Sequence, residues 1–337
     1  MPVHAKAPVF LGGGQITFAE REYGDPERGE LLIRVEANAI CGTDRNQFFA
    51  GSQWVPGHEG VGTVIAAGDG TRTMAGTRGA VFLMDYCGQC RSCVKGHTNQ
   101  CSAKRKDMGF TADGAFGPYE VVHESNFFPV PPDISGPEAT LLLDVMGTSG
   151  HALSRIGQMR EDVESLYIAG AGPIGLGALV MARIRFGMDT PIYISDFSRW
   201  RLDFAESLGG IPVDLTTEGP LSTVQNIDAA IDSTGKTVAR RAALSLLGQR
   251  GVLACVGHGE GLTLTVSDDL IAPERTVMGS EYFRFNEMAG NLEILQANRE
   301  LLGRIITHQV PRVEIRHAFE LFLGGKTGKV VVVGDDQ

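Results

Sequence analysis

Residues 166–175, Leu-Tyr-Ile-Ala-Gly-Ala-Gly-Pro-Ile-Gly, run from an apolar strand through a glycine-rich turn into the start of a helix. In a Gly-x-Gly-x-x-Gly turn the first glycine makes the tight bend. The second lets the backbone approach a pyrophosphate, and the third allows close packing of the helix. The amino terminus of that helix presents N–H groups to the anion. The stretch therefore predicts a dinucleotide-binding turn, with contacts from Gly170, Gly172, Pro173, Ile174 and Gly175.

An acidic residue stands where such a turn needs a partner. The next apolar strand ends at Asp196, 21 positions after Gly175, and a carboxylate there accepts hydrogen bonds from the adenosine ribose. Because the same carboxylate would repel a 2′-phosphate, we expect NAD rather than NADP. Arg199 and Arg201 follow closely and leave NADP as the alternative, since an arginine can accommodate that phosphate. Arg201 is therefore counted with the cofactor-binding residues.

Strands and helices alternate along the middle of the chain. Strands are predicted at 165–169, 191–195, 228–231 and 251–256, with helices such as 174–186 and 199–207 between them. This alternation is typical of βαβ units, in which a parallel sheet carries helices on both faces. Two further continuous helices are predicted, over 138–156 and 288–302. The fold class is therefore α/β with a doubly wound parallel sheet.

The two ends of the chain have a different, β-rich texture. Short β-like runs separated by turn residues occupy 31–37, 60–67, 79–84 and 118–122. The last apolar strand, 329–333, resembles them, so the tail is expected to return to the first domain. We expect one domain from 1–145 and 287–337, and a dinucleotide-binding domain from 146–286.

Composition excludes several classes of function. The chain has 337 residues, about twice the usual domain length of roughly 100–200, and a net charge of −10 with a pI near 5.3. An acidic chain has no electrostatic footprint for nucleic acid or anionic membranes. The uncharged run 165–182 is interrupted by glycines and a proline, so it is not a membrane span. Because the first ten residues lack a signal-peptide core, we expect a cytoplasmic location.

Four of the six cysteines lie within fifteen residues, spaced Cys-x2-Cys-x2-Cys-x7-Cys. Four thiolates in a short loop can close a tetrahedral shell around Zn²⁺ and leave no open position, which makes the role structural. An iron–sulfur cluster is the chemical rival, although the loop lacks the usual Cys-Pro ending. Four unrelated thiols are the remaining alternative. The expected structural zinc ligands are Cys87, Cys90, Cys93 and Cys101.

A second metal site is predicted from dispersed residues. A catalytic zinc takes three protein ligands from distant parts of a chain and keeps one position open. Cys41 and His58 are candidates, and Glu59 stands beside the histidine between flanking glycines. Asp144 ends an apolar run, where a charge is costly unless it is paired or metal-bound. A core histidine at 58 and a salt bridge at 144 are the alternatives.

The chain resembles the medium-chain dehydrogenase/reductase superfamily, in its zinc-dependent alcohol and polyol dehydrogenase branch. The resemblance spans nearly the whole chain, and it implies a GroES-like β domain formed by both chain ends with a Rossmann domain between them. It rests on Cys41-Gly42-Thr43-Asp44, Gly57-His58-Glu59, the four-cysteine lobe, Gly170–Gly175, Asp232-Ser233-Thr234-Gly235 and Gly325-Lys326-Thr327-Gly328-Lys329.

The resemblance implies roles for the metal-site residues. Cys41 and His58 are similar to the catalytic zinc ligands, Glu59 to a neighbouring or exchanging ligand, and Asp44 to the carboxylate that orients the histidine. Asp144 stands where relatives place Cys, Glu or Asp. The segment 144–151 is similar to that of Asp-bearing secondary alcohol dehydrogenases, which tend to lack the structural zinc lobe. The chain therefore mixes features of two groups.

Proton transfer and substrate binding are less completely matched. Thr43 resembles the hydroxyl that takes the alcohol proton, but Asn46 replaces the histidine that relays it in many relatives, and asparagine cannot titrate. The proton must therefore leave through water, the cofactor ribose or another group. Arg284 resembles the arginine of the sorbitol dehydrogenase substrate network, with a plain salt bridge as its alternative. The expected substrate residues are Asn46, Trp54 and Arg284.

These observations predict an oxidoreductase with two zinc ions per chain, one catalytic and one structural, and with NAD. Zinc acts there as a Lewis acid on the substrate oxygen while a hydride passes to the nicotinamide. Polar pocket residues favour a polyol, sugar or cyclitol, whose secondary hydroxyl is oxidised. Secondary alkanol and L-threonine-type dehydrogenases are the alternatives, and a non-catalytic zinc-binding scaffold is the alternative of another class. The family implies a homodimer or homotetramer.

Overall fold

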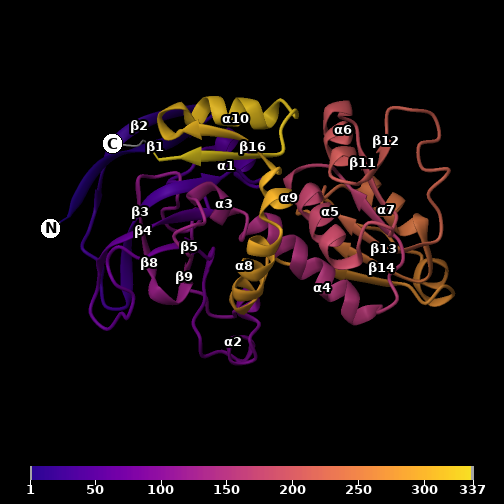
Figure 1. Ribbon diagram of the computed structural model, residues 1–337, viewed down its shortest axis with the longest axis horizontal. Coiled ribbons are helices and arrows are strands. Elements are labelled where there is room, and N and C mark those ends of the chain that lie inside the picture. Colours follow the sequence, from indigo (N-terminus) through magenta and orange to yellow (C-terminus); the bar gives the residue numbers. More distant parts are fainter. Residues whose placement is uncertain (1, 335–337) are drawn as a thin grey trace. The chain divides into compact units, whose positions relative to one another are not determined.

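The computed structural model describes residues 2–334, which form two compact units (Figure 1). The first contains residues up to Leu143, Arg284–Ala297 and the described residues from Ile306 onward. The second contains Asp144–Phe283 and Asn298–Ile305. Among the helices of residues 2–334, none is long and apolar enough to cross a membrane.

The second unit is built on a six-stranded, fully parallel sheet. Its strand order, β12-β11-β10-β13-β14-β15, is the doubly wound order 3-2-1-4-5-6 of dinucleotide-binding folds. Helices from the same unit pack against this sheet (Figure 1). The predicted α/β fold class is thereby confirmed. The elements are η3 (Asp144–Thr148), α4 (Ser149–Met159), β10 (Leu166–Ala169), α5 (Pro173–Phe186), β11 (Ile192–Asp196), α6 (Arg199–Ser207), β12 (Ile211–Asp214), β13 (Ile227–Asp232), α7 (Thr237–Leu246), β14 (Leu247–Cys255), η4 (Ser267–Ile271), β15 (Thr276–Gly279) and α9 (Arg299–Gly303).

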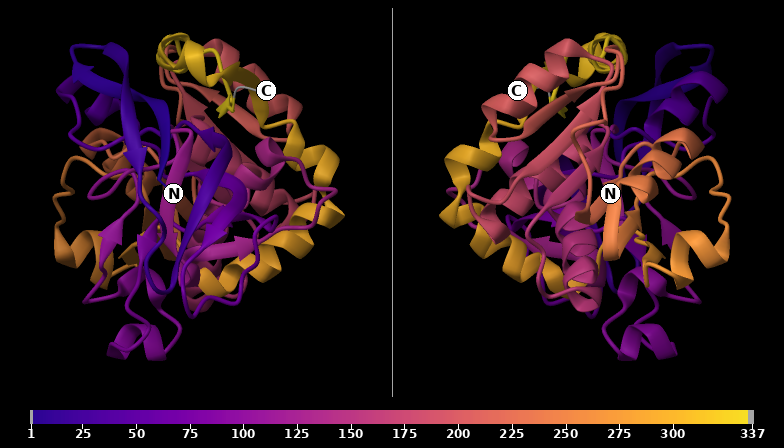
Figure 2. Two further views of the ribbon diagram at one scale, coloured as in Figure 1. Left: turned by 90° about the vertical axis from the view of Figure 1, so that its left-hand side faces the viewer. Right: turned by 90° about the vertical axis from the view of Figure 1, so that its right-hand side faces the viewer.

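The first unit is mostly β-structure. A seven-stranded sheet has the order β16-β17-β3-β4-β5-β9, with β8 paired to β3. The C-terminal strand β17 lies antiparallel to β3, and α10 packs on β16 and β17 (Figure 1 and Figure 2). Both chain ends thus build one sheet. The elements are β1 (Val3–Gly12), β2 (Gln15–Tyr23), β3 (Glu30–Ala39), α1 (Asp44–Ala50), β4 (Gly60–Ala67), β5 (Arg78–Val81), β6 (Met84–Asp85), α2 (Arg91–Val94), η1 (Thr98–Gln100), β7 (Lys106–Asp107), β8 (Tyr119–His123), η2 (Glu124–Asn126), β9 (Phe127–Pro129), α3 (Gly136–Thr140), η5 (Phe285–Glu287), α8 (Met288–Ala297), β16 (Ile306–Pro311), η6 (Arg312–Glu314), α10 (Ile315–Leu323) and β17 (Lys329–Val333).

Two predicted helices are divided in the structure. The helix expected over 138–156 is wrong as a single element, because α3 ends at Thr140 and a π-helical turn, η3, precedes α4. Such turns are frequent at functional sites. The helix expected over 288–302 is interrupted at Asn298, whose φ of −128° and ψ of 29° leave the helical region. Asparagine favours this because its side chain competes for backbone hydrogen bonds.

An aromatic cluster fixes helix α1, which carries several site residues. Phe48 of α1 stacks on Phe319 of α10 with ring centroids 4.7 Å apart and an interplanar angle of 2°. Phe10 of β1 meets the same ring edge-on at 5.5 Å, and Phe116 does so at 5.6 Å. Such ring pairs add specific geometry to apolar burial. The position of α1 is therefore set by residues from three other segments of the chain.

One buried carboxyl in this unit predicts an unusual dependence of stability on pH. Glu120 of β8 is 1% exposed, and neither of its oxygens has a hydrogen-bond partner among residues 2–334. Burial, and secondarily Asp113, raise its pKa well above 4.5. Because the pKa of Glu120 is raised in the folded state, its contribution to the free energy of unfolding is fully present below about pH 4.5 and is lost as the pH rises.

We therefore expect Glu120→Gln to stabilise the protein at pH 7 by roughly 1 to 3 kcal/mol, with little effect at pH 4. Urea unfolding at both pH values measures the difference, and the exposed Glu22→Gln is the matched control. An equal effect of Glu120→Gln at the two pH values would contradict this account.

Candidate functional site

Strand pairing brings the first metal-binding candidates together. In the antiparallel pair β3 and β4, Asn38 lies opposite Gly60, so the residues just after β3 and just before β4 meet at one edge of the sheet. Cys41 stands on the first side of this edge, and His58 and Glu59 on the second. Donor atoms of Cys41, His58, Glu59 and Asp144 lie within 4.8 Å of one another, and all four residues are buried. Asp144 directly follows the first unit in the sequence.

Hydrogen bonds hold the two loops of this metal-binding group in place. Asp44 is fully buried, and its Oδ2 accepts the Cys41 N–H at 2.8 Å. Its Oδ1 lies 3.3 Å from His58 Nδ1, which leaves Nε2 as the nitrogen available to a metal. Asn38 Oδ1 accepts the Glu59 N–H at 2.9 Å. Gly57 is required before His58, because its φ is +100° and a Cβ there would lie 2.6 Å from the Phe116 nitrogen.

A buried ion pair holds Glu59. Lys329 Nζ donates to Glu59 Oε1, and the two side chains are 1% and 0% exposed. Lys329 begins the otherwise apolar strand β17, far from Glu59 in sequence. It was missing from the predicted site residues, although one cation in an apolar strand is a detectable signal. Lys329 offsets the negative charge of Glu59 beside the other donor atoms, because removing one partner of a buried ion pair leaves the other charge uncompensated.

The donor set of this group fits zinc. A thiolate, an imidazole and carboxylates are its usual ligands in catalytic sites. Thr43 adds a second feature, since its Oγ1 is buried and has no hydrogen-bond partner among the described residues. A buried hydroxyl without a protein partner is rare. It is what a residue that exchanges a proton with a bound alcohol requires.

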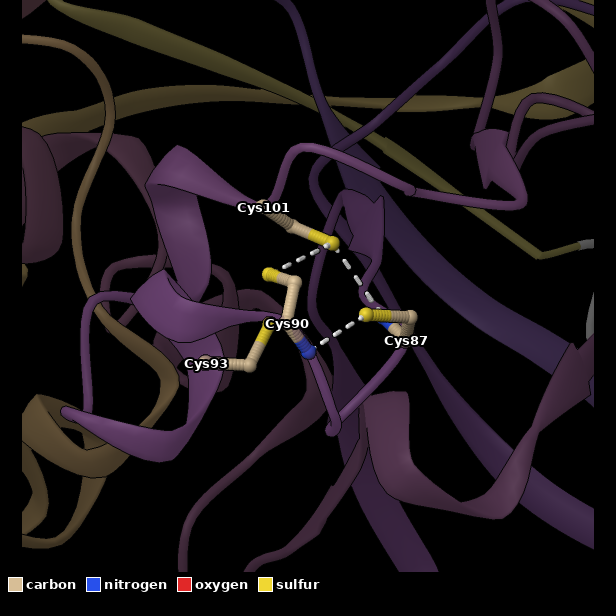
Figure 3. A group of neighbouring side chains, drawn as sticks. All are labelled: Cys87, Cys90, Cys93 and Cys101. Carbon is tan, nitrogen blue, oxygen red and sulfur yellow. Dashed lines mark hydrogen bonds between the residues drawn. The ribbon is translucent and has the colours of Figure 1, made fainter.

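The four cysteines of the lobe converge around one point (Figure 3). Their sulfur atoms lie within 4.8 Å of one another. The Cys87 N–H donates to Cys101 Sγ, and the Cys90 N–H to Cys87 Sγ, both at 3.3 Å. Backbone N–H groups, first that of Cys93, lower the pKa of Cys90 to about 5. Peptide dipoles thus favour the thiolate of Cys90, whereas burial raises the pKa of Cys93 to about 12. The convergence of the four sulfur atoms fits a closed zinc shell.

The lobe gives the first mutational prediction at the site. Cys93→Ala is expected to lower the zinc content from two ions per chain to one and to speed proteolysis of the loop, because a structural zinc contributes its binding free energy to folding. Metal analysis and limited proteolysis measure both effects. Two zinc ions retained in the variant would contradict the assignment, and acid-labile sulfide in the wild-type protein would show an iron–sulfur cluster instead.

The nucleotide turn of the second unit has the expected backbone. Gly170 follows β10 with φ of +94°, and a Cβ at Gly175 would lie 1.8 Å from the Gly170 carbonyl oxygen. Gly172 is the N-cap of α5 and supplies no side-chain cap. Pro173 and Ile174 open the helix. The first N–H groups of this helix thus remain available to an anion.

Asp196 lies beside this turn. It ends β11, and its Oδ2 accepts the Ala171 N–H at 2.9 Å while Oδ1 accepts the Ser198 N–H at 2.9 Å. Arg201 Nη1 is 3.8 Å from Oδ2, longer than a hydrogen bond. The carboxylate, paired at this distance with the Arg201 guanidinium, therefore lies at the edge of the turn, where a ribose-binding acid is expected.

The three expected substrate residues differ in exposure. Asn46 is exposed on α1, whereas Trp54 and Arg284 are partly buried. Arg284 forms no ion pair within the described residues, and its buried Nε lacks an acceptor there. The alternative role of Arg284, a plain salt bridge, therefore has no acidic partner within the described residues.

Known relatives match both units. Residues 27–132 match the model of the alcohol dehydrogenase GroES-like domain, and residues 173–297 match that of zinc-binding dehydrogenases. The L-threonine 3-dehydrogenase of Coxiella burnetii is 30% identical, over 91% of this chain and 92% of its own. The chain belongs to the zinc-dependent medium-chain dehydrogenase/reductase family. The oxidoreductase class is thereby confirmed, as are zinc and a nicotinamide dinucleotide as cofactors of the family.

Solved structures agree with this placement. An alcohol dehydrogenase from Thermus sp. ATN1 superposes with a TM-score of 0.89 at 25% identity, covering 98% of this chain and 99% of that one. The L-idonate 5-dehydrogenase of Escherichia coli has a TM-score of 0.84 at 22% identity, covering 99% of each chain. At this identity the likeness to the L-idonate 5-dehydrogenase establishes only the fold of this medium-chain dehydrogenase. It does not identify the substrate of this chain.

Proposed function

We propose that this dehydrogenase oxidises a secondary hydroxyl of a small polar substrate, a polyol, sugar or cyclitol, with NAD as the hydride acceptor. The observation that carries the proposal is the buried group of Cys41, His58, Glu59 and Asp144. Close by in sequence is the Thr43 hydroxyl, which has no hydrogen-bond partner within residues 2–334. A scaffold without catalysis has no need for a buried orphan hydroxyl beside a metal site.

Each residue of the site has a separate role in this proposal. Cys41, His58 and Asp144 would hold zinc, with Glu59 as a neighbouring or exchanging ligand. Zinc, when bound, supplies a Lewis acid that lowers the pKa of the alcohol. Thr43 Oγ1 would take the proton of the hydroxyl, and NAD, when bound, would supply the acceptor for the hydride from the same carbon. The products are a ketone, NADH and a proton. Since Asn46 cannot titrate, the proton would leave Thr43 through water, the cofactor ribose or another group.

NAD is favoured by the charge of Asp196. Its carboxylate accepts two backbone N–H groups, and the nearest guanidinium nitrogen of Arg201 is 3.8 Å away. A 2′-phosphate would meet this negative charge. A ribose hydroxyl would instead find an acceptor.

L-threonine is the second candidate substrate. The Coxiella burnetii relative that matches over 91% of this chain is an L-threonine 3-dehydrogenase, and L-threonine also carries a secondary hydroxyl. Its charged groups would need polar partners at the site, for which Arg284 is available.

A substrate panel tests the proposal. Polyols, sugars, L-threonine and short secondary alcohols are supplied with NAD or NADP, and nicotinamide absorbance is followed. We expect NADH formation with at least one polar secondary alcohol and two zinc ions per chain. If no alcohol is oxidised and only one zinc is present, the scaffold alternative is correct. Sedimentation of the same sample tests the proposed homodimer or homotetramer.

A further inference from the structure

The side chain of Gln47 has an unusual hydrogen-bonding state. Gln47 lies on α1, and its Nε2 donates to the Gly109 carbonyl oxygen at 2.6 Å. Its Oε1 is buried and accepts no hydrogen bond from the residues that the structure describes. A buried amide oxygen left without a donor costs about 1 to 3 kcal/mol. The residue therefore needs a reason beyond packing.

The orientation of this amide is fixed. Turning it over would place Oε1 against the Gly109 carbonyl oxygen, so two acceptors would face each other. The hydrogen bond to Gly109 therefore fixes the position of Nε2, and Oε1 points to the other side as an acceptor. A ligand meeting Gln47 must supply an O–H or N–H group.

Gln47 is placed beside the proposed reaction centre. Thr43 has helical dihedrals, and Gln47 stands four residues after it, so the two side chains share one face of α1. Long helical side chains lean toward the amino terminus, which brings the Gln47 amide back over Thr43. Gly109 is followed by Phe110, whose ring lies 5.1 Å from the His58 ring. Among the described residues, Thr43 Oγ1 and Gln47 Oε1 are therefore two buried oxygens without a hydrogen-bond partner, on side chains one helical turn apart in the segment that follows Cys41.

We propose that Gln47 Oε1 binds a donor group carried by the carbon next to the oxidised carbon of the substrate. This rests on the proposed function, because it takes Thr43 as the acceptor of the alcohol proton. A substrate whose hydroxyl meets Thr43 can satisfy Gln47 only with a second donor close by. That donor is the hydroxyl of a vicinal diol or the ammonium group of a vicinal amino alcohol. Gln47 is thus a specificity-determining residue.

Matched pairs of substrates test this assignment. 2,3-Butanediol and 2-butanol differ by the second hydroxyl, and L-threonine and 3-hydroxybutanoate differ by the ammonium group. We expect the wild-type enzyme to prefer the donor-bearing member of at least one pair. Gln47→Leu should lower kcat/KM for that member by about 10- to 100-fold, the worth of one buried hydrogen bond. It should change kcat/KM for the other member by less than about threefold. The pair that responds identifies the donor as hydroxyl or ammonium.

Two controls separate folding from specificity. Gln53→Leu makes the same chemical change at an exposed position six residues later. In each substrate pair it should leave the ratio of the two kcat/KM values, donor-bearing member over the other, unchanged. Calorimetric binding of the preferred member to enzyme loaded with NADH, which cannot react, should show the same loss in Gln47→Leu without any turnover.

Three results bear on the two proposals separately. An equal fall of kcat/KM for both members of each pair, or no wild-type preference in either pair, overturns the role of Gln47 and leaves the proposed dehydrogenase function intact. A wild-type protein that oxidises no alcohol overturns the proposed function. If the kcat/KM preference for the donor-bearing member is lost in Gln47→Leu but kept in Gln53→Leu, both the dehydrogenase function and the role of Gln47 are supported.

Discussion

Cys41→Ala is expected to reduce kcat/KM by about 1,000-fold or more while the protein stays folded. Cys41 is the only thiol in the buried group with His58, Glu59 and Asp144, and loss of a Lewis acid costs several kcal/mol of barrier lowering. The zinc content should fall from two ions per chain to one. Initial rates and metal analysis on the same preparation measure both effects, and circular dichroism reports the fold.

Cys255→Ala is the control for this substitution. Cys255 is a half-buried thiol at the end of β14 and belongs to neither metal-binding group. It should keep two zinc ions and nearly full activity. Full activity in Cys41→Ala would overturn the proposed mechanism. If Cys41→Ala retains both zinc ions, Cys41 is not a zinc ligand and the second ion is bound by other residues.

Lys329→Met is expected to destabilise the protein by about 3 to 5 kcal/mol, because removing one member of a buried ion pair leaves the other charge buried. Both side chains are almost fully buried, at 1% for Lys329 and 0% for Glu59. Methionine keeps the length of the apolar stem, so the loss reports the charge and not a cavity. The measurement is the midpoint of urea unfolding at constant zinc concentration.

Two further variants identify the cause. Lys326→Met changes the exposed lysine three residues earlier and should alter stability by less than about 0.5 kcal/mol. The double variant Glu59→Gln/Lys329→Met removes the stranded charge and should recover much of the lost stability. If the double variant is no more stable than Lys329→Met, the charge of Glu59 is not what Lys329 compensates.

Much of the chemistry was predictable because its signals are local. The turn at 170–175 works through glycines a few positions apart, and Asp196 follows at the distance that one βαβ unit imposes. The four lobe cysteines lie within one loop, and their sulfur atoms do meet (Figure 3). In each case chain connectivity alone brings the groups together, so residue types and spacing suffice.

The division of helix 138–156 was not predictable in this way. Its apolar pattern continues through Asp144, yet the chain forms a π-helical turn at 144–148. Gly147 lies there against the ring of Phe283, which a Cβ would approach to 2.4 Å. A packing partner more than 130 positions away thus occupies the space beside this turn, and no short window of sequence contains both residues.

By itself, the sequence determined the α/β class, the nucleotide turn, the cysteine lobe and the identity of the candidate ligands. Only the tertiary structure decided which side chains complete the site. The pairing of Lys329 with Glu59 depends on β17 joining the sheet that contains β3 and β4. The direction of the Gln47 oxygen depends on the carbonyl of Gly109, 62 positions away. Ion pairs and hydrogen bonds act over a few ångströms, so their partners are known only once the chain has folded.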